Sequence, residues 1–378
     1  MKKIVIGISI TLVMFLLIGC GKDKRNDLKN TEDNISPTPT EGATLPIKEE
    51  KGEVTPIVDD IVENRLTSRD YYPLISDTEY IYEGMGNEYA SFTMYIDYLD
   101  SDRGRMQTRT NNGGTETVRV IEVNDKAVTV IYVINESYYR DNLLNKEGAE
   151  GQEEILLQDP LIIGTNWELP DGRKRSITAT DVEIQTPSGN YKALEVTTES
   201  IDSKVMDYYA KEVGLVKSIF QSGDMEVTST LSEINQTTPL IQNLTVFYPD
   251  QDEKLHAEQV NVSFHTGDIT RLILKDALVN DLPKESYLPL FSSGTTIKSL
   301  SLGTDGIVYV DFSRELVTDM NVGAGYEMLI LQGIANTLGN YYGAKEIILT
   351  VDNKPYESGH ISAQEGETIK VNLEDIEY

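Results

Sequence analysis

The sequence predicts an α+β fold, in which a mostly antiparallel β region, built as a curved sheet or partial barrel, precedes an α/β region. Two patterns predict this order. Short runs of β-branched and aromatic residues, separated by turn residues, recur from residue 91 to residue 231, as is typical of antiparallel sheets. Apolar residues at helical spacing follow at 269–282 and 326–341, and strand-like runs alternate with them.

The chain is long enough for two ordinary domains and additional segments, since it has 378 residues. A polar stretch that ends at Pro239 separates the strand-rich half from the half with helical periodicity. We therefore predict four segments. These are a lipoprotein signal peptide at 1–19, a lipidated cysteine with a disordered linker at 20–66, a β-rich domain at 67–236 and an α/β domain at 238–378.

The composition excludes several classes of function. Acidic residues outnumber basic residues by 62 to 33, which gives a formal net charge of -29. A phosphate backbone would be repelled by this charge, so we expect no nucleic-acid partner. One cysteine and three histidines are too few for a disulfide framework or a Cys/His metal cluster. We therefore predict no metal site and no cofactor.

The first twenty residues predict export and lipid anchoring. Two lysines precede an apolar run at 4–18, which is shorter than the ~20 residues that a membrane-spanning helix needs. The run ends in Leu-Ile-Gly-Cys at 17–20, which resembles a bacterial lipobox, and Cys20 is the only cysteine of the chain. Lipidation of Cys20 would supply two acyl chains, enough for stable anchoring to the outer face of the cell membrane. The alternative is a plain secretory signal with an incidental cysteine.

The stretch from 21 to about 65 is predicted to be a tether. It is rich in charged residues, Asn, Thr and Pro, and has almost no aromatic residues, so it cannot bury enough apolar surface to fold. A flexible chain of this length has a root-mean-square reach of roughly 35–40 Å.

Several strands are expected in the β-rich domain. They lie at 91–98, 116–123, 127–133, 177–185, 191–198, within 205–217 and at 226–231, with a hairpin turn at 111–114. The stretch 208–217 resembles a strand pair of β-rich bacterial lipoproteins, some of which form half-open barrels. Such a sheet either encloses an apolar ligand, such as a lipid, or fills its own interior with side chains, as small barrels usually do.

The C-terminal domain is expected to alternate strands and helices. Strands are predicted at 244–250, 259–264, 296–302, 307–312 and 346–351, and helices at 269–282 and 326–341. Gly343 follows the second helix at the position of a C-terminal stop.

This domain resembles the GerM domain. The matching features follow one another over about 130 residues: Val246-Phe247-Tyr248-Pro249-Asp250, Leu288-Pro289, Gly294-Thr295, Asp305-Gly306, Val310-Asp311-Phe312-Ser313, Glu327, Asn336-Thr337-Leu338 and Val351-Asp352. One departure is Asn353, where the family favours Gly, although Asn also tolerates a positive φ.

The resemblance implies an extracytoplasmic module connected with sporulation and germination. It also implies an α/β fold like that of the ring-building motifs of secretion-type assemblies. Those motifs associate through a helix–sheet face and do not carry out chemistry, so the resemblance supplies no catalytic residues.

Several residues are of types that can carry chemistry. Ser313 lacks a nucleophile elbow and is interpreted as a helix cap. The histidines His256, His265 and His360 are scattered and are interpreted as surface residues. Asp250, Asp252 and Glu253 form an acidic loop that lacks the Gly and distal Glu of an EF-hand. We therefore predict no catalytic residue.

The Tyr341-Tyr342 pair leaves two interpretations open. Tyrosine is enriched at protein interfaces, so the pair could anchor a partner. It could equally form a half-buried cap over the sheet.

Two functions remain. The first is a non-enzymatic lipoprotein that associates with other membrane or sporulation-associated proteins, or with itself through the GerM domain. The alternative is a carrier whose β-rich domain holds a lipid or a cell-wall fragment. A hydrolase would need a constellation of acid, base or nucleophile that the sequence does not present.

Overall fold

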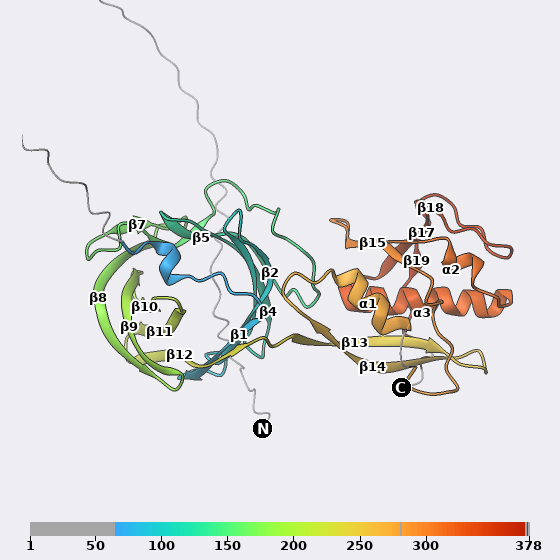
Figure 1. The fold of residues 1–378 in the computed structure, drawn as a ribbon, viewed down its shortest axis with the longest axis horizontal. Coiled ribbons are helices and arrows are strands. Elements are labelled where there is room, and N and C mark those ends of the chain that lie inside the picture. Colours follow the sequence, from blue (N-terminus) through green and yellow to red (C-terminus); the bar gives the residue numbers. More distant parts are fainter. Residues whose placement is uncertain (1–64, 280–281, 375, 377–378) are drawn as a thin grey trace, which may run out of the picture. The chain divides into compact units, whose positions relative to one another are not determined.

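The structure is a computed structural model that describes residues 65–279, 282–374 and 376. The described residues from Leu66 onward belong to one compact unit (Figure 1). Cys20, the predicted signal peptide at 1–19 and nearly all of the predicted linker lie outside the described residues.

Twelve antiparallel strands form a single curved sheet in the first part of the unit (Figure 1). Its strands are β1 (Thr78–Met85), β2 (Phe92–Asp100), β3 (Arg105–Asn111), β4 (Glu116–Val123), β5 (Ala127–Asn135), β6 (Glu154–Gln158), β7 (Asn166–Glu168), β8 (Lys174–Thr186), β9 (Gly189–Glu199), β10 (Lys204–Ala210), β11 (Gly214–Ser222) and β12 (Met225–Gln236). In space the order is β6-β5-β4-β3-β2-β1-β12-β11-β10-β9-β8-β7. The pairing of β1 with β12 therefore joins two six-stranded meanders into a nearly closed sheet.

Side chains bridge the two free edges of this sheet, which are β6 and β7. The indole Nε1 of Trp167 in β7 donates to the carbonyl of Ile155 in β6 at 3.0 Å. Arg175 in β8 donates to the same carbonyl at 2.6 Å and pairs with Glu154 of β6 at 2.8 Å. Polar side chains thus occupy the place of the missing strand pairing.

The interior of the sheet is packed with apolar side chains. Its fully or nearly fully buried members include Ile96, Met106, Ile121, Val123, Val128, Leu157, Ile177, Val196, Val216 and Leu231. The ring of Tyr82 stacks on that of Phe92 with 4.2 Å between centroids. A short 3-10 helix, η1 (Ser68–Tyr71), precedes β1, and Tyr71 and Tyr72 pack against the same core.

The second part of the unit places two helices between a hairpin and a mixed sheet (Figure 1). Its elements are β13 (Leu240–Pro249), β14 (Leu255–Phe264), α1 (Thr270–Val279), β15 (Ile297–Leu302), β16 (Val308–Phe312), α2 (Glu315–Thr318), α3 (Ala324–Tyr342), β17 (Glu346–Val351), β18 (Lys354–Pro355) and β19 (Ile369–Lys370). The strands β13 and β14 form the hairpin, and β15 to β19 form the mixed sheet, in which β16 and β17 are parallel. The predicted fold class, a curved antiparallel sheet followed by an α/β region, is confirmed.

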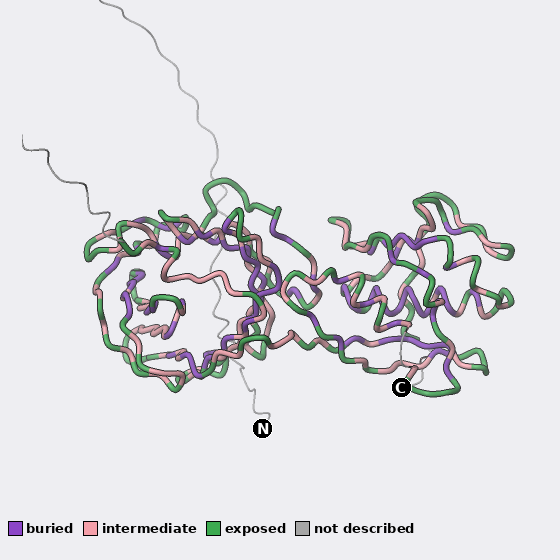
Figure 2. Tube along the Cα trace, viewed as in Figure 1, coloured by how far each residue is buried: buried purple, intermediate pink, exposed green. Residues whose placement is uncertain are grey.

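Helix α3 is largely buried because it packs on both the hairpin and the mixed sheet, and Figure 2 shows buried residues along most of its second half. Gly333 allows α3 to approach β13 closely. A Cβ built there would lie 2.5 Å from the carbonyl oxygen of Phe247 in β13. The helix ends as predicted at Gly343, whose φ of 67° is left-handed.

Four strands of the curved sheet have no counterpart among those predicted from the sequence. They are β1, β3, β6 and β7. The last two are short edge strands of five and three residues. In β3 the charged Arg109 and the polar Gln107 are buried alongside Met106, so the strand lacks the alternation of polar and apolar residues that marks a half-buried strand.

Candidate functional site

The motif residue Asp311 organises a turn in the mixed sheet. Its Oδ1 accepts hydrogen bonds from the hydroxyl of Thr350 and from the backbone N–H of Asn353, both at 2.7 Å. The turn between β17 and β18 has two central residues, Asp352 and Asn353, with φ of 53° and 59°. This pair of positive φ angles is typical of a tight type I′ hairpin turn. The prediction that Asn353 takes a positive φ is confirmed.

The motif residue Glu327 lies in the first turn of α3 and is buried. It is 3% exposed, and its Oε1 accepts a hydrogen bond at 2.8 Å from the hydroxyl of Tyr356, which is 2% exposed. Burial, and then the neighbouring carboxylate, raises the pKa of Tyr356. The pair therefore ties the start of α3 to the segment that follows β18.

The motif residues Asn336 and Thr337 connect α3 to two other segments. The hydroxyl of Thr337 accepts the backbone N–H of Phe247 in β13 at 3.1 Å. The side-chain amide of Asn336 donates to the carbonyl of Asn372 at 2.6 Å and accepts its N–H at 2.8 Å. The motif's buried polar groups thus satisfy backbone groups of the chain itself, as buried polar groups must.

The structure corrects the interpretation of Ser313 as a helix cap. Helix α2 begins after Arg314 and has no side-chain cap hydrogen bond. The hydroxyl of Ser313 accepts the backbone N–H of Thr296 at 2.9 Å instead, and it also hydrogen-bonds the carboxylate of Glu315. Ser313 therefore joins two neighbouring segments of the chain.

The three histidines do not share one environment. His265 and His360 are exposed, as expected. The interpretation of His256 as a surface residue is wrong. Its ring is mostly buried, lies 2.8 Å from Asp250 Oδ2 and stacks on the ring of Tyr287.

The acidic loop at 250–253 is a hydrogen-bonded turn. Asp250 Oδ1 accepts the backbone N–H groups of Asp252 at 2.9 Å and Lys254 at 3.0 Å. Desolvation alone would raise the pKa of Asp250, but the hydrogen bonds from His256 and the backbone outweigh it and lower that pKa. Among the residues that the structure describes, no group of three His, Cys, Asp or Glu could hold a metal ion.

Tyr341 and Tyr342 point inward, which argues against an interface anchor, and they are buried, not half-buried as the cap interpretation expected. The hydroxyl of Tyr341 accepts the backbone N–H of Arg140 at 3.0 Å, and that of Tyr342 donates to Asp141 Oδ1 at 2.9 Å. The pair therefore anchors the loop between β5 and β6, and is not free to anchor a partner.

Arg140, which sequence reasoning did not single out, lies where this loop meets both parts of the unit. Its side chain is fully buried. Its guanidinium donates to the carbonyls of Asp97 at 2.6 Å, His265 at 2.9 Å and Asp268 at 2.5 Å. Asp97 belongs to the curved sheet, whereas the other two carbonyls lie between β14 and α1. One cation thus satisfies backbone groups from both parts.

A second buried arginine, Arg109, shares the carboxylate of Asp97 with Arg140. Arg109 Nη2 lies 3.1 Å from Asp97 Oδ2, and its Nη1 lies 2.7 Å from Glu116 Oε2. Arg140 Nε is 3.7 Å from Asp97 Oδ1. Two cations therefore face two carboxylates, as the cost of burying charge requires. No sequence signal identifies Arg140 or Asp97, because the pairing depends on residues far apart in the chain.

Asp77 and Thr266 form a second connection between the two parts. The N–H of Asp77 donates to the hydroxyl of Thr266, and the N–H of Thr266 donates to Asp77 Oδ1, both at 2.7 Å. The hydroxyl of Tyr95 in β2 also donates to the carbonyl of Phe264 in β14 at 3.1 Å. These reciprocal bonds fix the start of β1 against the end of β14.

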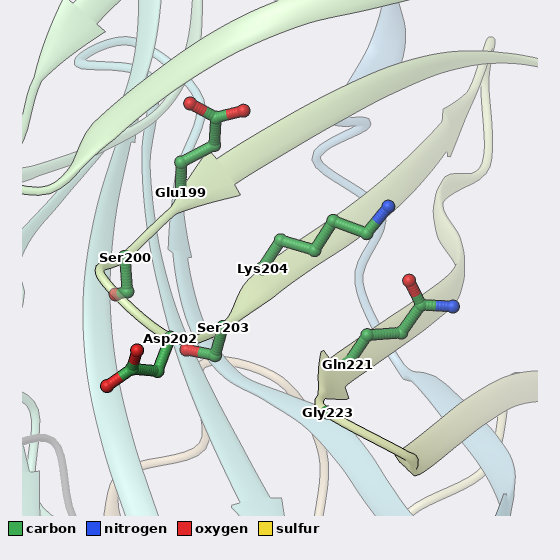
Figure 3. A pocket seen from close by; sticks show the side chains of 7 residues that line it. All are labelled: Glu199, Ser200, Asp202, Ser203, Lys204, Gln221 and Gly223. Carbon is green, nitrogen blue, oxygen red and sulfur yellow. The ribbon is translucent and has the colours of Figure 1, made fainter.

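One surface hollow lies between the tips of the β9–β10 and β11–β12 hairpins (Figure 3). It is lined by Glu199, Ser200, Asp202, Ser203, Lys204, Gln221 and Gly223. These side chains are polar and open to solvent, unlike the mostly apolar lining of a typical ligand pocket. The hollow does not suit the apolar ligand considered from the sequence.

Within 65–279, 282–374 and 376, no helix combines the length and the apolar character needed to cross a membrane.

Comparison with known families supports the expectation drawn from the motifs. Residues 245–357 match the family model "Germane: Sporulation and spore germination". No curated protein sequence matches the chain.

Solved structures give weaker similarities. The tandem GerMN domains of the sporulation protein GerM from Bacillus subtilis match with 17% identity and a TM-score of 0.27, over 33% of this chain and 45% of that chain. The first GerMN domain of the same protein matches with 17% identity and a TM-score of 0.26, over 32% of this chain and 94% of that chain. A protein with a YmcC-like fold from Bacteroides fragilis matches with 11% identity and a TM-score of 0.28, over 44% of this chain and 98% of that chain. This chain therefore spans less than half of the tandem GerMN structure.

Proposed function

Because residues 245–357 form a GerM-like domain, we propose that this chain is an extracytoplasmic lipoprotein that acts without catalysis during sporulation or spore germination. Cys20 anchors it to the cell membrane, and the GerM-like domain associates with other proteins or with itself. No nucleic acid, metal or cofactor takes part.

The non-enzymatic part of the proposal rests on one observation: the polar side chains of the GerM-like motif are bonded within the chain itself. Asp311, Glu327, Asn336 and Thr337 are buried and bonded to other groups of the chain. An active site instead presents an acid, a base or a nucleophile to a substrate. The motif therefore supports a scaffold that holds strands and helices in place.

The anchoring part of the proposal rests on the sequence. Cys20 ends an apolar run of the length of a signal peptide and is the only cysteine. Two acyl chains on this residue would hold the chain at the membrane, and the predicted linker would let the folded unit stand away from the lipid.

Fractionation of cells that express the full chain tests the anchor. We expect the wild-type chain to incorporate a fatty-acid label and to sediment with membranes. Cys20→Ala should abolish the label and release the chain, whereas Ser36→Ala, in the same predicted linker, should change neither. A Cys20→Ala chain that keeps its label at another residue would contradict the anchor.

Spore formation tests the role. Deletion of the gene should lower the yield of heat-resistant spores or slow germination, and the wild-type chain should restore it. Ser313→Ala should restore it equally, because Ser313 serves no chemical step. A deletion that leaves sporulation and germination unchanged, or a Ser313→Ala chain that folds but is inactive, would refute the proposed role.

The alternative of a ligand carrier has less support, since side chains fill the interior of the curved sheet. A chain that retains bound lipid in native mass spectrometry would favour it.

A further inference from the structure

Within the part of the chain that the structure describes, the outer edge of β14 has unpaired backbone groups. The N–H of Asp250 donates to the carbonyl of Lys254, which sets the pairing of the hairpin. Residues of antiparallel strands alternate between hydrogen-bonded and non-hydrogen-bonded pairs. The backbone N–H and C=O groups therefore point toward β13 at His256, Glu258, Val260 and Val262. The intervening residues, 257, 259, 261 and 263, direct their N–H and C=O groups away from it. Among the described residues β14 pairs with β13 alone.

This edge lacks the features that usually protect edge strands, which are lysine, proline and β-bulges. Residues 255–264 contain no lysine and no proline. The register of β13 with β14 runs unbroken from Leu240↔Phe264 to Pro249↔Leu255, whereas β1–β12, β4–β5 and β10–β11 all contain an irregularity. The edge is therefore long, regular and open to strand addition.

The other edge of the hairpin differs because α3 covers part of it. The hydroxyl of Thr337 accepts the N–H of Phe247, and Gly333 packs close to the carbonyl of the same residue. A new strand would meet helix α3 there. Strand addition is thus favoured at β14.

The charge distribution indicates what pairs with this edge. A quarter of the whole chain is charged, with a net charge of -29. In the two strands of the hairpin, Glu258 is the one Asp, Glu, Lys or Arg, and it pairs with Lys284 at 2.7 Å. The side chains opposite one another on the outer face are uncharged: Ile241 and Ser263, Asn243 and Asn261, Thr245 and Gln259. Two copies of this acidic chain would meet here with the least repulsion.

We propose that β14 of one chain pairs antiparallel with β14 of a second copy, so that two hairpins form a four-stranded sheet across a two-fold axis. Antiparallel pairing of one strand with its copy gives the self-complementary contact of a two-fold dimer, and backbone hydrogen bonds supply the attraction, as in other cases of strand addition. The inference rests on the proposed function, because anchoring both copies to one membrane raises their effective concentration.

Cysteine cross-linking of the full chain in its membrane tests the pairing. Each of Ala257→Cys, Gln259→Cys, Asn261→Cys and Ser263→Cys is exposed to a mild oxidant. We expect disulfide-linked dimer at the residue nearest the two-fold axis, severalfold above Thr245→Cys, which lies on the same outer face but in β13. The wild-type chain measures any contribution of Cys20. Dimer at none of the four positions above this control would overturn the inference.

A proline variant gives an independent result. In the best cross-linking background, Asn261→Pro removes an outward N–H without breaking a β13–β14 bond, so it should abolish most of the dimer. Asn243→Pro, at the paired position of β13, should leave the dimer and serves as the matched control. Equal dimer in both proline variants would also overturn the inference.

The failure of this inference can be told apart from that of the proposed function. Absence of cross-links from a chain that is fatty-acid labelled at Cys20 and supports sporulation refutes β14 pairing alone. Absence of the label and of any sporulation defect on deletion refutes the proposed function as well.

Discussion

The guanidinium of Arg140 donates a hydrogen bond at 2.6 Å to the backbone carbonyl of Asp97, and both side chains are 0% exposed. The same guanidinium lies 4.1 Å from the centre of the Tyr98 ring and 4.9 Å from that of Phe264. Aromatic faces stabilise a buried cation. Arg140, in the loop between β5 and β6, is therefore one of the residues that join the curved sheet to the GerM-like domain.

Replacing Arg140 should destabilise the whole unit. Arg140→Met leaves the carbonyls of Asp97, His265 and Asp268 without their donor, and removing one partner of a buried charged network costs about 3–5 kcal/mol. We expect urea unfolding at neutral pH to show this loss in the free energy of unfolding.

The matched control is Arg103→Met, because Arg103 pairs with Asp100 at 2.7 Å while its side chain is 44% exposed. Exposed pairs contribute about 0–1 kcal/mol. Equal unfolding midpoints for the two variants would contradict the role assigned to Arg140.

Gly333 and Gly325 of α3 should respond oppositely to alanine. At Gly333 the new Cβ would lie 2.5 Å from the carbonyl oxygen of Phe247, whereas at Gly325 the nearest atom, Glu253 Oε1, is 3.7 Å away. Gly333→Ala should lower the free energy of unfolding by about 1–3 kcal/mol, the usual cost of overpacking. Gly325→Ala should be neutral or raise it by up to ~1 kcal/mol, because alanine favours helices. Thermal unfolding of both variants checks this, and a Gly333→Ala chain as stable as Gly325→Ala would argue against close α3–β13 packing.

Asp141 should make stability depend on pH. Burial raises its pKa from 3.8 to about 6, although hydrogen bonds from Tyr342 and Leu302 act in the other direction. The folded state therefore holds the proton more tightly than the unfolded state. Its contribution to stability is present in full below pH 3.8 and is lost as the pH rises through about 6.

Asp141→Asn removes this contribution, so its free energy of unfolding should fall less between pH 4 and pH 7 than that of the wild-type chain. Asp100→Asn is the control, since hydrogen bonds from Arg103 lower the pKa of that partly exposed carboxylate. Parallel pH profiles for the wild-type and Asp141→Asn chains would show that Asp141 is not protonated in this range.

The seam of the curved sheet, where side chains bridge its free edges β6 and β7, can be monitored by fluorescence. Trp167 lies at this seam and is the only tryptophan of the chain. Arg175→Met removes one of the two side-chain donors to the Ile155 carbonyl and leaves Glu154 unpaired. The seam should then open more often, and acrylamide should quench Trp167 fluorescence more strongly. Arg173→Met, which removes a more exposed pair with Asp171, should leave quenching unchanged. The same quenching in both variants would mean that the seam does not depend on Arg175.

Features encoded by local pattern were predictable from the sequence. The apolar spacing of α3, its stop at Gly343 and the positive φ of Asn353 all follow from short segments whose geometry limits the choice of residue. The curved sheet followed by α/β elements could be predicted for the same reason.

Features that depend on distant partners were not predictable. Strand β3 was missed because Gln107 and Arg109 are buried against the loop between β5 and β6, so their polarity suggested exposure. The largely buried position of His256 does not follow from its local sequence, because its stacking partner, Tyr287, lies beyond α1. Ser313 was interpreted as a cap because the local sequence suits one, whereas its hydroxyl bonds Thr296 in the neighbouring segment.

The intact mass of the chain extracted from membranes tests the central claim of a lipid-anchored, non-catalytic protein most directly. We predict a mature chain that begins at Cys20 and carries a diacylglyceryl group on its sulfur. A chain with an unmodified Cys20, or one cleaved elsewhere, would contradict the account.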